Sequence, residues 1–311
     1  MQVRTVRSDL TEIVHEVDAV VVARDGSELF VSGDADRALF YRSAIKPFQA
    51  TVALEAGADL APEHLALACA SHGGFPAHLA IVERILAGGG FTEDDLGCPP
   101  AWPLAASARD LAVAGGQRHP RRLFHNCSGK HAAWLRACRA AGWPIGGYLE
   151  PGHPLQRRIV EVVRDATGVD PEPVGVDGCG APTLRGTVRG LARAFSSLTT
   201  DDRFTAAARA VDRFPALVAD DLRPDGRFAM WWGGPVKVGA AGLVGAGRNG
   251  LGLAARSRSG DPAAAVAGLV EAARRVGLLT PAMAQALADV AAPPVVGGGR
   301  VVGGTSIDER P

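Results

Sequence analysis

The sequence contains almost no lysine. Of its 33 basic residues, 30 are arginine, and only Lys46, Lys130 and Lys237 are lysine. A chain that uses arginine for nearly every solvated cation retains lysine where a side chain must lose its proton or bind a metal, which guanidinium does not do. Each of the three also lies in a segment marked by glycine, serine or proline. The lysines are therefore candidate functional residues.

The sequence also lacks net charge and any block of like charge, since 33 acidic residues balance the 33 basic ones. We therefore expect neither nucleic acid nor an anionic membrane surface as a partner. The sequence contains no run of about 18 apolar residues, so no membrane span is predicted. The N-terminal segment lacks the apolar core of a signal peptide. We expect a cytoplasmic protein whose partners are small molecules or a second copy of itself.

Cysteine is scarce and irregularly spaced. The five residues are Cys69, Cys98, Cys127, Cys138 and Cys179. Structural disulfides are not expected for an odd number of cysteines in a protein of this kind. Cys69 and Cys138 fall on apolar helical stretches, where a thiol packs as a small apolar side chain. Thiolate chemistry is therefore considered at other cysteines.

Neither repeats nor alternating strand and helix patterns occur. The 311 residues, 47% of them apolar, predict a single domain over residues 1–311, which could have two lobes. β-branched residues cluster from Ile13 to Gly33 around an Asp25-Gly26 turn, and short β runs return near Asn249-Gly250 and at 299–304. The missing βαβ alternation disfavours a doubly wound sheet. We predict an α+β fold, with a mainly antiparallel sheet built from both termini and an inserted helical layer.

The middle of the chain has helical apolar spacing. This spacing predicts helices at Ser43–Ala56, Pro62–Ala70, Pro76–Leu86, Ala105–Ala114, Lys130–Ala141, Leu155–Ala166, Thr183–Phe195 and Arg203–Ala219. Two further helices are predicted at Pro262–Val276 and near Pro281–Val290. The loops between the central helices hold many of the side chains that could carry chemistry.

Ser43 and Lys46 stand three residues apart at a predicted helix start. On a helix their Cβ atoms would lie about 5–6 Å apart, so Lys46 could take the Ser43 proton. A lysine acts as such a base when burial or nearby cations lower its pKa. Pro47 places Ser43 near the helix N-terminus, where the helix dipole favours negative charge. The same S-x-x-K pattern marks the acylating serine of β-lactamases. A capping serine followed by a surface lysine is the alternative.

Two further segments carry candidate site residues. Ser71 and His72 follow a predicted helix, with Gly73-Gly74 allowing close backbone approach. They either end that helix or supply a second hydroxyl near Lys46 or Lys237. Asp177 lies two residues from a cysteine and could orient a ligand, bind a substrate ammonium or serve a turn.

The segment 124–134 concentrates side chains that can bind metals. Cys127, Lys130 and His131 meet there at a loop-to-helix junction, and Cys179 is the best distant partner for a zinc site. Alternatively, Cys127 is a nucleophile with His131 as its base, or a buried thiol beside a capping serine.

Together, RSAIKPFQA, CASHGG, HNCSGKHAAWL and DGCGAP, with the lysine of PVKVGAAG, resemble the L-asparaginase II family of the Rhizobium etli type. The resemblance covers nearly the whole chain. It implies an L-asparaginase, a serine-dependent amidohydrolase with a fold similar to class A β-lactamases, usually a homodimer. It implies that hydrolysis of L-asparagine gives L-aspartate and ammonia.

The resemblance also assigns roles to residues. It implies two neighbouring Ser-Lys pairs, zinc ligands that hold one Zn2+ per chain, and four residues that line the substrate site. The pairs are Ser43 with Lys46 and Ser71 with Lys237; the zinc ligands are Cys127, Lys130 and Cys179; the lining residues are Arg42, His72, His131 and Asp177. Which serine is acylated stays open.

The sequence departs from the family pattern at three places. Phe75 and Ala241 stand where family members usually carry an acidic residue, and the 98–101 segment lacks the family's histidine. The chemistry is therefore better supported than the substrate. The alternatives are a β-lactamase-like serine hydrolase of another amide or ester, and a non-catalytic member that binds an amino acid or zinc.

Overall fold

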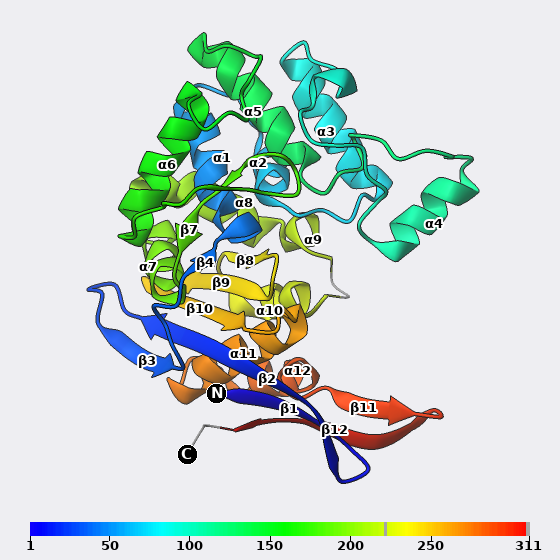
Figure 1. Ribbon diagram of the computed structural model, residues 1–311, viewed down its shortest axis with the longest axis vertical. Coiled ribbons are helices and arrows are strands. Elements are labelled where there is room, and N and C mark those ends of the chain that lie inside the picture. The colour runs from blue at the N-terminus through cyan, green and yellow to red at the C-terminus, as the bar shows by residue number, and fades with distance from the viewer. Residues whose placement is uncertain (221–222, 309–311) are drawn as a thin grey trace.

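Strands from both ends of the chain form one sheet in the computed structural model, which describes residues 1–220 and 223–308 (Figure 1). Eight antiparallel strands make up this sheet in the order β11-β12-β1-β2-β10-β9-β8, with β3 paired to β2. They are β1 (Gln2–Arg7), β2 (Leu10–Val22), β3 (Glu28–Ser32), β8 (Val236–Gly239), β9 (Leu243–Arg248), β10 (Leu251–Ser257), β11 (Pro294–Gly297) and β12 (Arg300–Asp308). The predicted α+β class and the antiparallel sheet built from both termini are confirmed.

The long strand β2 divides the sheet into an exposed and a buried part. Its residues 10–16 pair with β1 and are mostly exposed, whereas residues 17–22 pair with β10 and are buried. Because successive side chains of a strand point to opposite faces, Val20 and Val22 enter one core and Ala19 and Val21 the other. We call these the helical-layer core and the α11 core.

Helices cover both faces of the buried part. Helix α7 (Val188–Leu198) packs on β2, β9 and β10 from the helical-layer core, and α11 (Pro262–Arg275) packs on the same strands from the other face. Beside α11 lie α10 (Pro224–Trp232), α12 (Pro281–Ala286) and α13 (Ala288–Ala291). The sheet therefore lies between two apolar layers.

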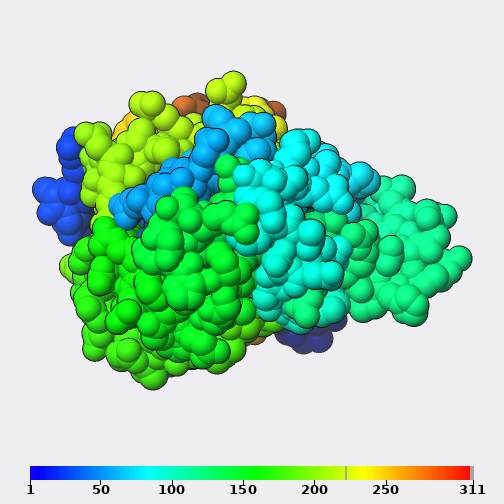
Figure 2. All heavy atoms as spheres, turned by 90° about the horizontal axis from the view of Figure 1, so that it is seen from above, coloured from blue at the N-terminus to red at the C-terminus, as the bar shows by residue number. Residues whose placement is uncertain are grey.

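The inserted helical layer contains the remaining helices (Figure 1). They are η1 (Arg42–Ile45), α1 (Lys46–Glu55), α2 (Pro62–Cys69), α3 (Pro76–Gly88), η2 (Glu93–Asp95), α4 (Ala106–Ala114), α5 (Ser128–Ala141), α6 (Pro154–Thr167), η3 (Asp202–Phe204), α8 (Thr205–Arg213) and α9 (Pro215–Val218). Short strands β4 (Leu39–Phe40), β5 (Gly175–Val176), β6 (Pro182–Thr183) and β7 (Arg185–Gly186) connect them. Figure 2 shows that α3 and α4, in cyan and blue-green, extend to one side.

Two predicted helices had wrong bounds. The helix predicted from Thr183 begins only at Val188, because Thr187 caps it by accepting the Gly190 amide and Thr183 lies in β6. The helix predicted over Arg203–Ala219 ends at Arg213, since Pro215 has no amide hydrogen to continue it. Helix α10 and strand β1 were not predicted.

No helix among residues 1–220 and 223–308 has the length and apolar character needed to cross a membrane.

Candidate active site

The segment that carries Ser43 and Lys46 is held between the helical layer and strand β8. Ser43 lies in the 3-10 helix η1, and Lys46 is the first residue of α1, which begins where η1 ends. A Cβ on Gly239 of β8 would lie 2.9 Å from the Tyr41 carbonyl and 3.2 Å from the Ala44 amide. A side chain at this position would therefore push β8 away from η1. Glycine here allows the strand that carries Lys237 to approach Ser43.

The hydroxyl of Ser71 lies between two lysines. Lys46 Nζ and Lys237 Nζ each lie 3.1 Å from Ser71 Oγ, and all three residues are buried. The lysines also donate to backbone carbonyls, Lys46 to Ala70 at 2.5 Å and Lys237 to Val238 at 2.6 Å. Within the described part of the chain, the hydrogen bonds of Lys46 thus go to Ala70 and Ser71, and none goes to Ser43. The three side chains form a continuous hydrogen-bonded chain.

Lys237 is set apart by its electrostatics. Burial lowers its pKa well below 10.5, and the positive charges of Lys46 and Arg223 lower it further. An amine with a depressed pKa can be neutral near physiological pH and then accept a proton. Lys237 therefore has the properties of a general base, which a solvated lysine lacks.

Ser43 and Ser71 both line one cavity of about 440 Å³. Asn126, Arg223 and Asp225 are the other polar or charged side chains among its described lining residues. The rest of the wall is small or apolar and includes Ala241, whose backbone adopts the left-handed conformation with φ of 60°. The cavity thus places two hydroxyls, two opposite charges and an apolar wall around one space.

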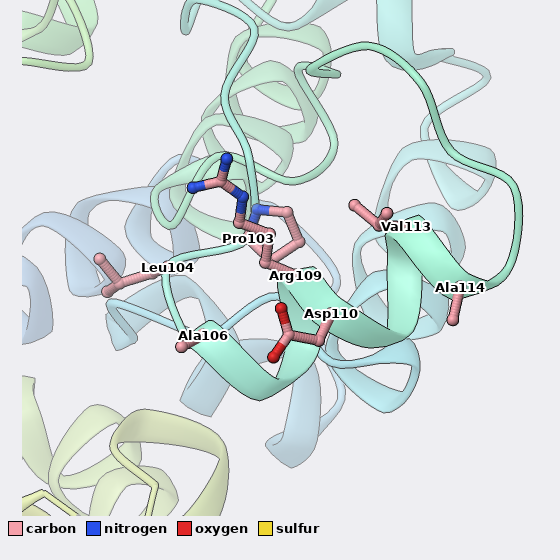
Figure 3. A pocket seen from close by; sticks show the side chains of 7 residues that line it. All are labelled: Pro103, Leu104, Ala106, Arg109, Asp110, Val113 and Ala114. Carbon is pink, nitrogen blue, oxygen red and sulfur yellow. The ribbon is translucent and has the colours of Figure 1, made fainter.

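A larger hollow of about 700 Å³ lies against α4 (Figure 3). The Arg109 guanidinium and the Asp110 carboxylate on its wall point in different directions, and Arg109 stacks over Trp102. None of its lining residues is a predicted site residue, although Leu104 is shared with the cavity that contains the two serines. The hollow therefore borders the candidate site without containing its chemistry.

The three predicted zinc ligands come together. Lys130 Nζ lies 3.4 Å from Cys179 Sγ, and all three residues are buried. A hydrogen bond from Cys179 lowers the pKa of Cys127 well below 9.0, and Lys46 and Lys130 act in the same direction. Sharing its proton with Cys127 raises the pKa of Cys179, and the two sulfurs raise the pKa of Lys130. The cluster therefore holds thiolate character beside the Lys130 ammonium, which must lose its proton before it can bind a metal.

This donor set fits zinc. Two sulfur atoms that can become thiolates and one nitrogen are ligand types that Zn2+ takes, and a catalytic zinc keeps a further position open. No group of three or more histidine, cysteine or carboxylate side chains within 1–220 and 223–308 is placed to hold a metal. The lysine nitrogen is therefore needed to complete a three-ligand site.

Arg42 and Asp177 bond to each other. Arg42 Nε lies 2.7 Å and Nη2 lies 2.6 Å from the same carboxylate oxygen, Asp177 Oδ1, which also accepts the Gly178 amide. Arg42 has a φ of 49°, so its backbone turns sharply next to Ser43. Neither residue lines the cavity with the two serines. The pair lies close enough to the cysteine cluster for Asp177 to raise the pKa of Lys130.

The two predicted histidines are buried and neutral. Burial, followed by the charge of His78, lowers the pKa of His72 to about 3, and its Nε2 shares a hydrogen bond of 2.9 Å with Ser128. Burial and Lys130 lower the pKa of His131 well below 6.5, and its Nδ1 lies 2.8 Å from the Tyr148 hydroxyl. The second ring nitrogen of each histidine is buried without a protein partner among the described residues. Both imidazole rings are therefore uncharged near neutral pH.

Sequence reasoning missed four residues near these groups. Asn126 lines the cavity, and its side-chain oxygen lies 3.6 Å from Cys127 Sγ; its place inside the HNCSGKH motif was the available signal. Tyr148 and the Arg223–Asp225 ion pair carried no such signal. Arg223 in particular is one arginine among 30.

Several solved structures match the chain at low sequence identity. Mglu in its native form is 17% identical over 85% of this chain and 66% of that chain, with a TM-score of 0.48. Mglu in its glutamate form gives 17% identity, 85% and 61% coverage and a TM-score of 0.48. A Mycobacterium bovis β-lactamase is 16% identical over 88% and 95% of the two chains, with a TM-score of 0.36.

The chain thus spans just under two thirds of the length of these Mglu chains. No curated protein sequence matches it. A model of the L-asparaginase II family matches residues 3–307. Because this match covers nearly the whole sequence, the chain belongs to the L-asparaginase II family.

Proposed function

We propose that the protein is an L-asparaginase that hydrolyses L-asparagine to L-aspartate and ammonia through a lysine-activated serine. The observation that carries this proposal is the Lys46–Ser71–Lys237 chain, with both lysine nitrogens 3.1 Å from the Ser71 hydroxyl. That chain borders a cavity which Ser43 also lines. Membership of the L-asparaginase II family supports an amide as the substrate.

Ser43 is the nucleophile in this proposal. Its half-buried side chain faces the cavity, whereas Ser71 is only 6% exposed and engaged with two lysines. Lys237, neutral because of its depressed pKa, takes a proton from Lys46 through Ser71. Lys46 can then accept the Ser43 proton as Ser43 Oγ attacks the side-chain amide carbon. The carbon–nitrogen bond breaks, the leaving nitrogen takes this proton from Lys46 and departs as ammonia, and an ester to Ser43 remains. Lys237 returns its proton to Lys46 through Ser71.

Water completes the cycle. Lys237, with its depressed pKa, takes a proton from the water through Ser71, and the attack releases aspartate and restores the Ser43 hydroxyl. The oxyanion of each tetrahedral intermediate would be stabilised by the first amides of η1, which a helix leaves without intrahelical partners. The Ala44 amide is excluded, because it already donates to the Tyr41 carbonyl at 3.1 Å.

We also propose one Zn2+ per chain, held by Cys127, Lys130 and Cys179. When bound, zinc would supply Lewis-acid polarisation beside the substrate. Arg42 and Asp177 are proposed to bind the substrate carboxylate and ammonium, which requires their mutual ion pair to open toward the ligand. His72 and His131 would line the site as neutral rings.

The zinc proposal predicts stoichiometric metal that depends on both sulfurs. Protein purified without added zinc should carry about one zinc per chain, and the Cys127→Ser, Cys179→Ser double variant should carry none. Binding requires two thiolates and a neutral amine, so zinc should be released as the pH falls. Elemental analysis across a pH series measures this. The matched control is Cys138→Ser, which removes a buried thiol that bears no proposed ligand role.

Full zinc occupancy in the double variant would contradict the site.

The asparaginase proposal predicts ammonia release from asparagine with little from glutamine. Ala241 brings no charge to the cavity wall, and the Phe75 ring packs edge-on against His78. If family members use acidic side chains at these positions to support the substrate ammonium, affinity here should be weaker. A missing charge-assisted hydrogen bond costs roughly 10- to 150-fold in binding. We expect a high Michaelis constant for asparagine and a further increase in Asp177→Asn, measured by steady-state ammonia release.

A preference for glutamine, or no ammonia from either amide with zinc bound, would contradict this assignment.

The second candidate is hydrolysis of a larger amide or ester. The cavity wall contributed by Leu104, Pro224, Val238 and Pro262 is apolar, which favours a substrate with an apolar portion. Nitrocefin hydrolysis without ammonia release from asparagine would support this candidate. Asparagine binding without turnover of either compound would indicate a non-catalytic member.

Single-domain organisation, a homodimer and a cytoplasmic location stay proposals. The homodimer is supported by the exposed apolar side chains Leu10, Ile13, Val14 and Val301 on the exposed part of the sheet.

A further inference from the structure

An ion pair outside the predicted site contacts the Ser71 backbone. Arg223 Nε and Nη2 lie 3.1 and 2.8 Å from the two carboxylate oxygens of Asp225, so the pairing is bidentate. The remaining terminal nitrogen, Nη1, donates to the Ser71 carbonyl at 3.2 Å. One guanidinium thus connects the start of α10 to the residue between the two lysines.

The pair is also the charged wall of the cavity. Among the described residues that line the space shared by Ser43 and Ser71, Arg223 and Asp225 are the charged ones. The Asp225 side chain is 8% exposed, and that of Arg223 is 26% exposed. A bidentate pair with a buried carboxylate holds its geometry better than an exposed ion pair.

The local fold fixes this pair. Arg223 occupies the N-cap position of α10, Pro224 begins the helix with its preset φ, and Asp225 lies in the first turn. A Cβ on Gly226 would lie 1.9 Å from the Asp220 carbonyl, so glycine lets the chain pack tightly there. The guanidinium is therefore presented to Ser71 from a tightly packed helix start.

We propose that Arg223 and Asp225 act as one positioning unit, in which Arg223 holds the Ser71 carbonyl and the two charges set the electrostatic environment of Lys237. The inference rests on the proposed role of Ser71 and Lys237 in hydrolysis. Neither residue touches the reacting atoms, and both act through the Ser71–Lys237 pair. Among the described residues, Arg42 and Asp177 bond to each other and make no hydrogen bond to Ser71.

The electrostatic part of the unit has opposed signs. The titratable and charged groups that act electrostatically on Lys237 are Lys46 from α1, Cys69 from α2, Cys127 from the start of α5, and Arg223 and Asp225 from the start of α10. Arg223 lowers the pKa of Lys237 and Asp225 raises it. Removing Arg223 should therefore raise the pKa of Lys237, and removing Asp225 should lower it. A general loss of packing would not produce opposite signs.

The lysine content of the chain gives a direct measurement. Because Lys46, Lys130 and Lys237 are the only lysines, protein labelled with carbon-13 at lysine Cε gives three NMR signals. The Lys237→Met variant identifies the Lys237 signal by its absence. Titration of this signal with pH reports protonation of Lys237 without any substrate.

We expect Arg223→Gln to raise the Lys237 midpoint and Asp225→Asn to lower it, each by about half a unit or more. The double variant should return the midpoint toward wild type, because both charges are absent. The control is Arg227→Gln, which breaks the exposed ion pair between Arg227 of α10 and Asp289 of α13. It should leave the midpoint unchanged. Unchanged midpoints in both single variants, or shifts of the same sign, would overturn the electrostatic part.

Kinetics test the positioning part. Arg223→Gln should lower kcat by about 10-fold or more, with a smaller change in KM, because a hydrogen bond from a charged donor to Ser71 is lost. The double variant should remain slow although its Lys237 midpoint is restored. Arg223→Lys keeps the positive charge but loses the planar set of guanidinium donors. Its kcat should lie between those of the wild type and Arg223→Gln. Wild-type kcat in the folded double variant would overturn the positioning role.

The two hypotheses fail in different ways. If wild-type protein releases no ammonia from asparagine, the proposed function fails, whereas the lysine titration still tests the Arg223–Asp225 unit.

Discussion

Replacing Ser43 with alanine should abolish turnover and leave the fold intact. Without the nucleophile no acyl-enzyme forms, and loss of a catalytic serine costs at least about 10³-fold in kcat. No described hydrogen bond is made by the Ser43 hydroxyl, so its removal leaves no buried partner unsatisfied. We expect a change in unfolding free energy within about 0.5 kcal/mol. Ammonia release and thermal unfolding of the same preparation measure both effects.

Ser71→Ala provides the contrast. It removes the hydroxyl that accepts from both Lys46 and Lys237, so it should lose activity and also stability, by about 1–3 kcal/mol for a buried group left unpaired. Mass spectrometry after rapid acid quenching would locate the ester on Ser43 in the wild type. If the folded Ser43→Ala protein has activity near wild type, or if the ester is on Ser71, the assignment of Ser43 as the nucleophile is wrong and Ser71 takes that role.

Lys237→Met should remove most of the activity while keeping the fold. Loss of a positioned general base costs about 10²–10⁴-fold in rate. Lys237→Arg should be comparably inactive, because arginine keeps the positive charge but cannot lose its proton. Steady-state kinetics of the two variants therefore separate a base from a simple cation. Lys237→Arg with more than a tenth of wild-type activity would contradict the base assignment.

The same lysine has a pH signature in stability. Its folded pKa lies below the unfolded value near 10.5, so between these two values the unfolded chain holds a proton that the folded chain does not. The free energy of unfolding therefore rises with pH across that window. Below the folded pKa, the folded protein bears the full cost of burying the charged Lys237 side chain. Relative to wild type, Lys237→Met should gain stability as the pH falls from 10.5. Thermal unfolding across a pH series checks this sign.

Much of the fold followed from local patterns. The Asp25-Gly26 and Asn249-Gly250 turns predicted hairpins, and the structure joins β2 to β3 and β9 to β10 at these points. Strand β1 was not predicted because its sequence, QVRTVR, contains two arginines and only two apolar side chains. It pairs with β2 on one side and, on the other side, with β12, more than 290 residues away. Such long-range pairing is invisible in a local window.

The part of the candidate site that lies within sequence motifs could be predicted from the sequence. The sequence placed Cys127, Lys130 and Cys179 in two specific motifs, and the structure brings Lys130 and Cys179 into contact. The spacing of Ser43 and Lys46 suggested a direct bond, whereas Lys46 instead reaches Ser71, 25 residues further along. The Arg223–Ser71 contact spans 152 residues. Side-chain direction and distant contacts of this kind require the packed structure.

The position of β8 makes catalysis depend on both apolar layers at once. Val236, next to Lys237, packs in the α11 core, whereas Ile45 and Ala70, next to Lys46 and Ser71, pack in the helical-layer core. The hydrogen-bonded chain from Lys46 to Lys237 therefore crosses the seam between the two layers. A slight separation of the layers would break it while each layer kept its secondary structure. Under mild denaturant, enzymatic activity would then be lost before circular dichroism changes, making turnover a sensitive report on how well the two halves of the molecule are docked.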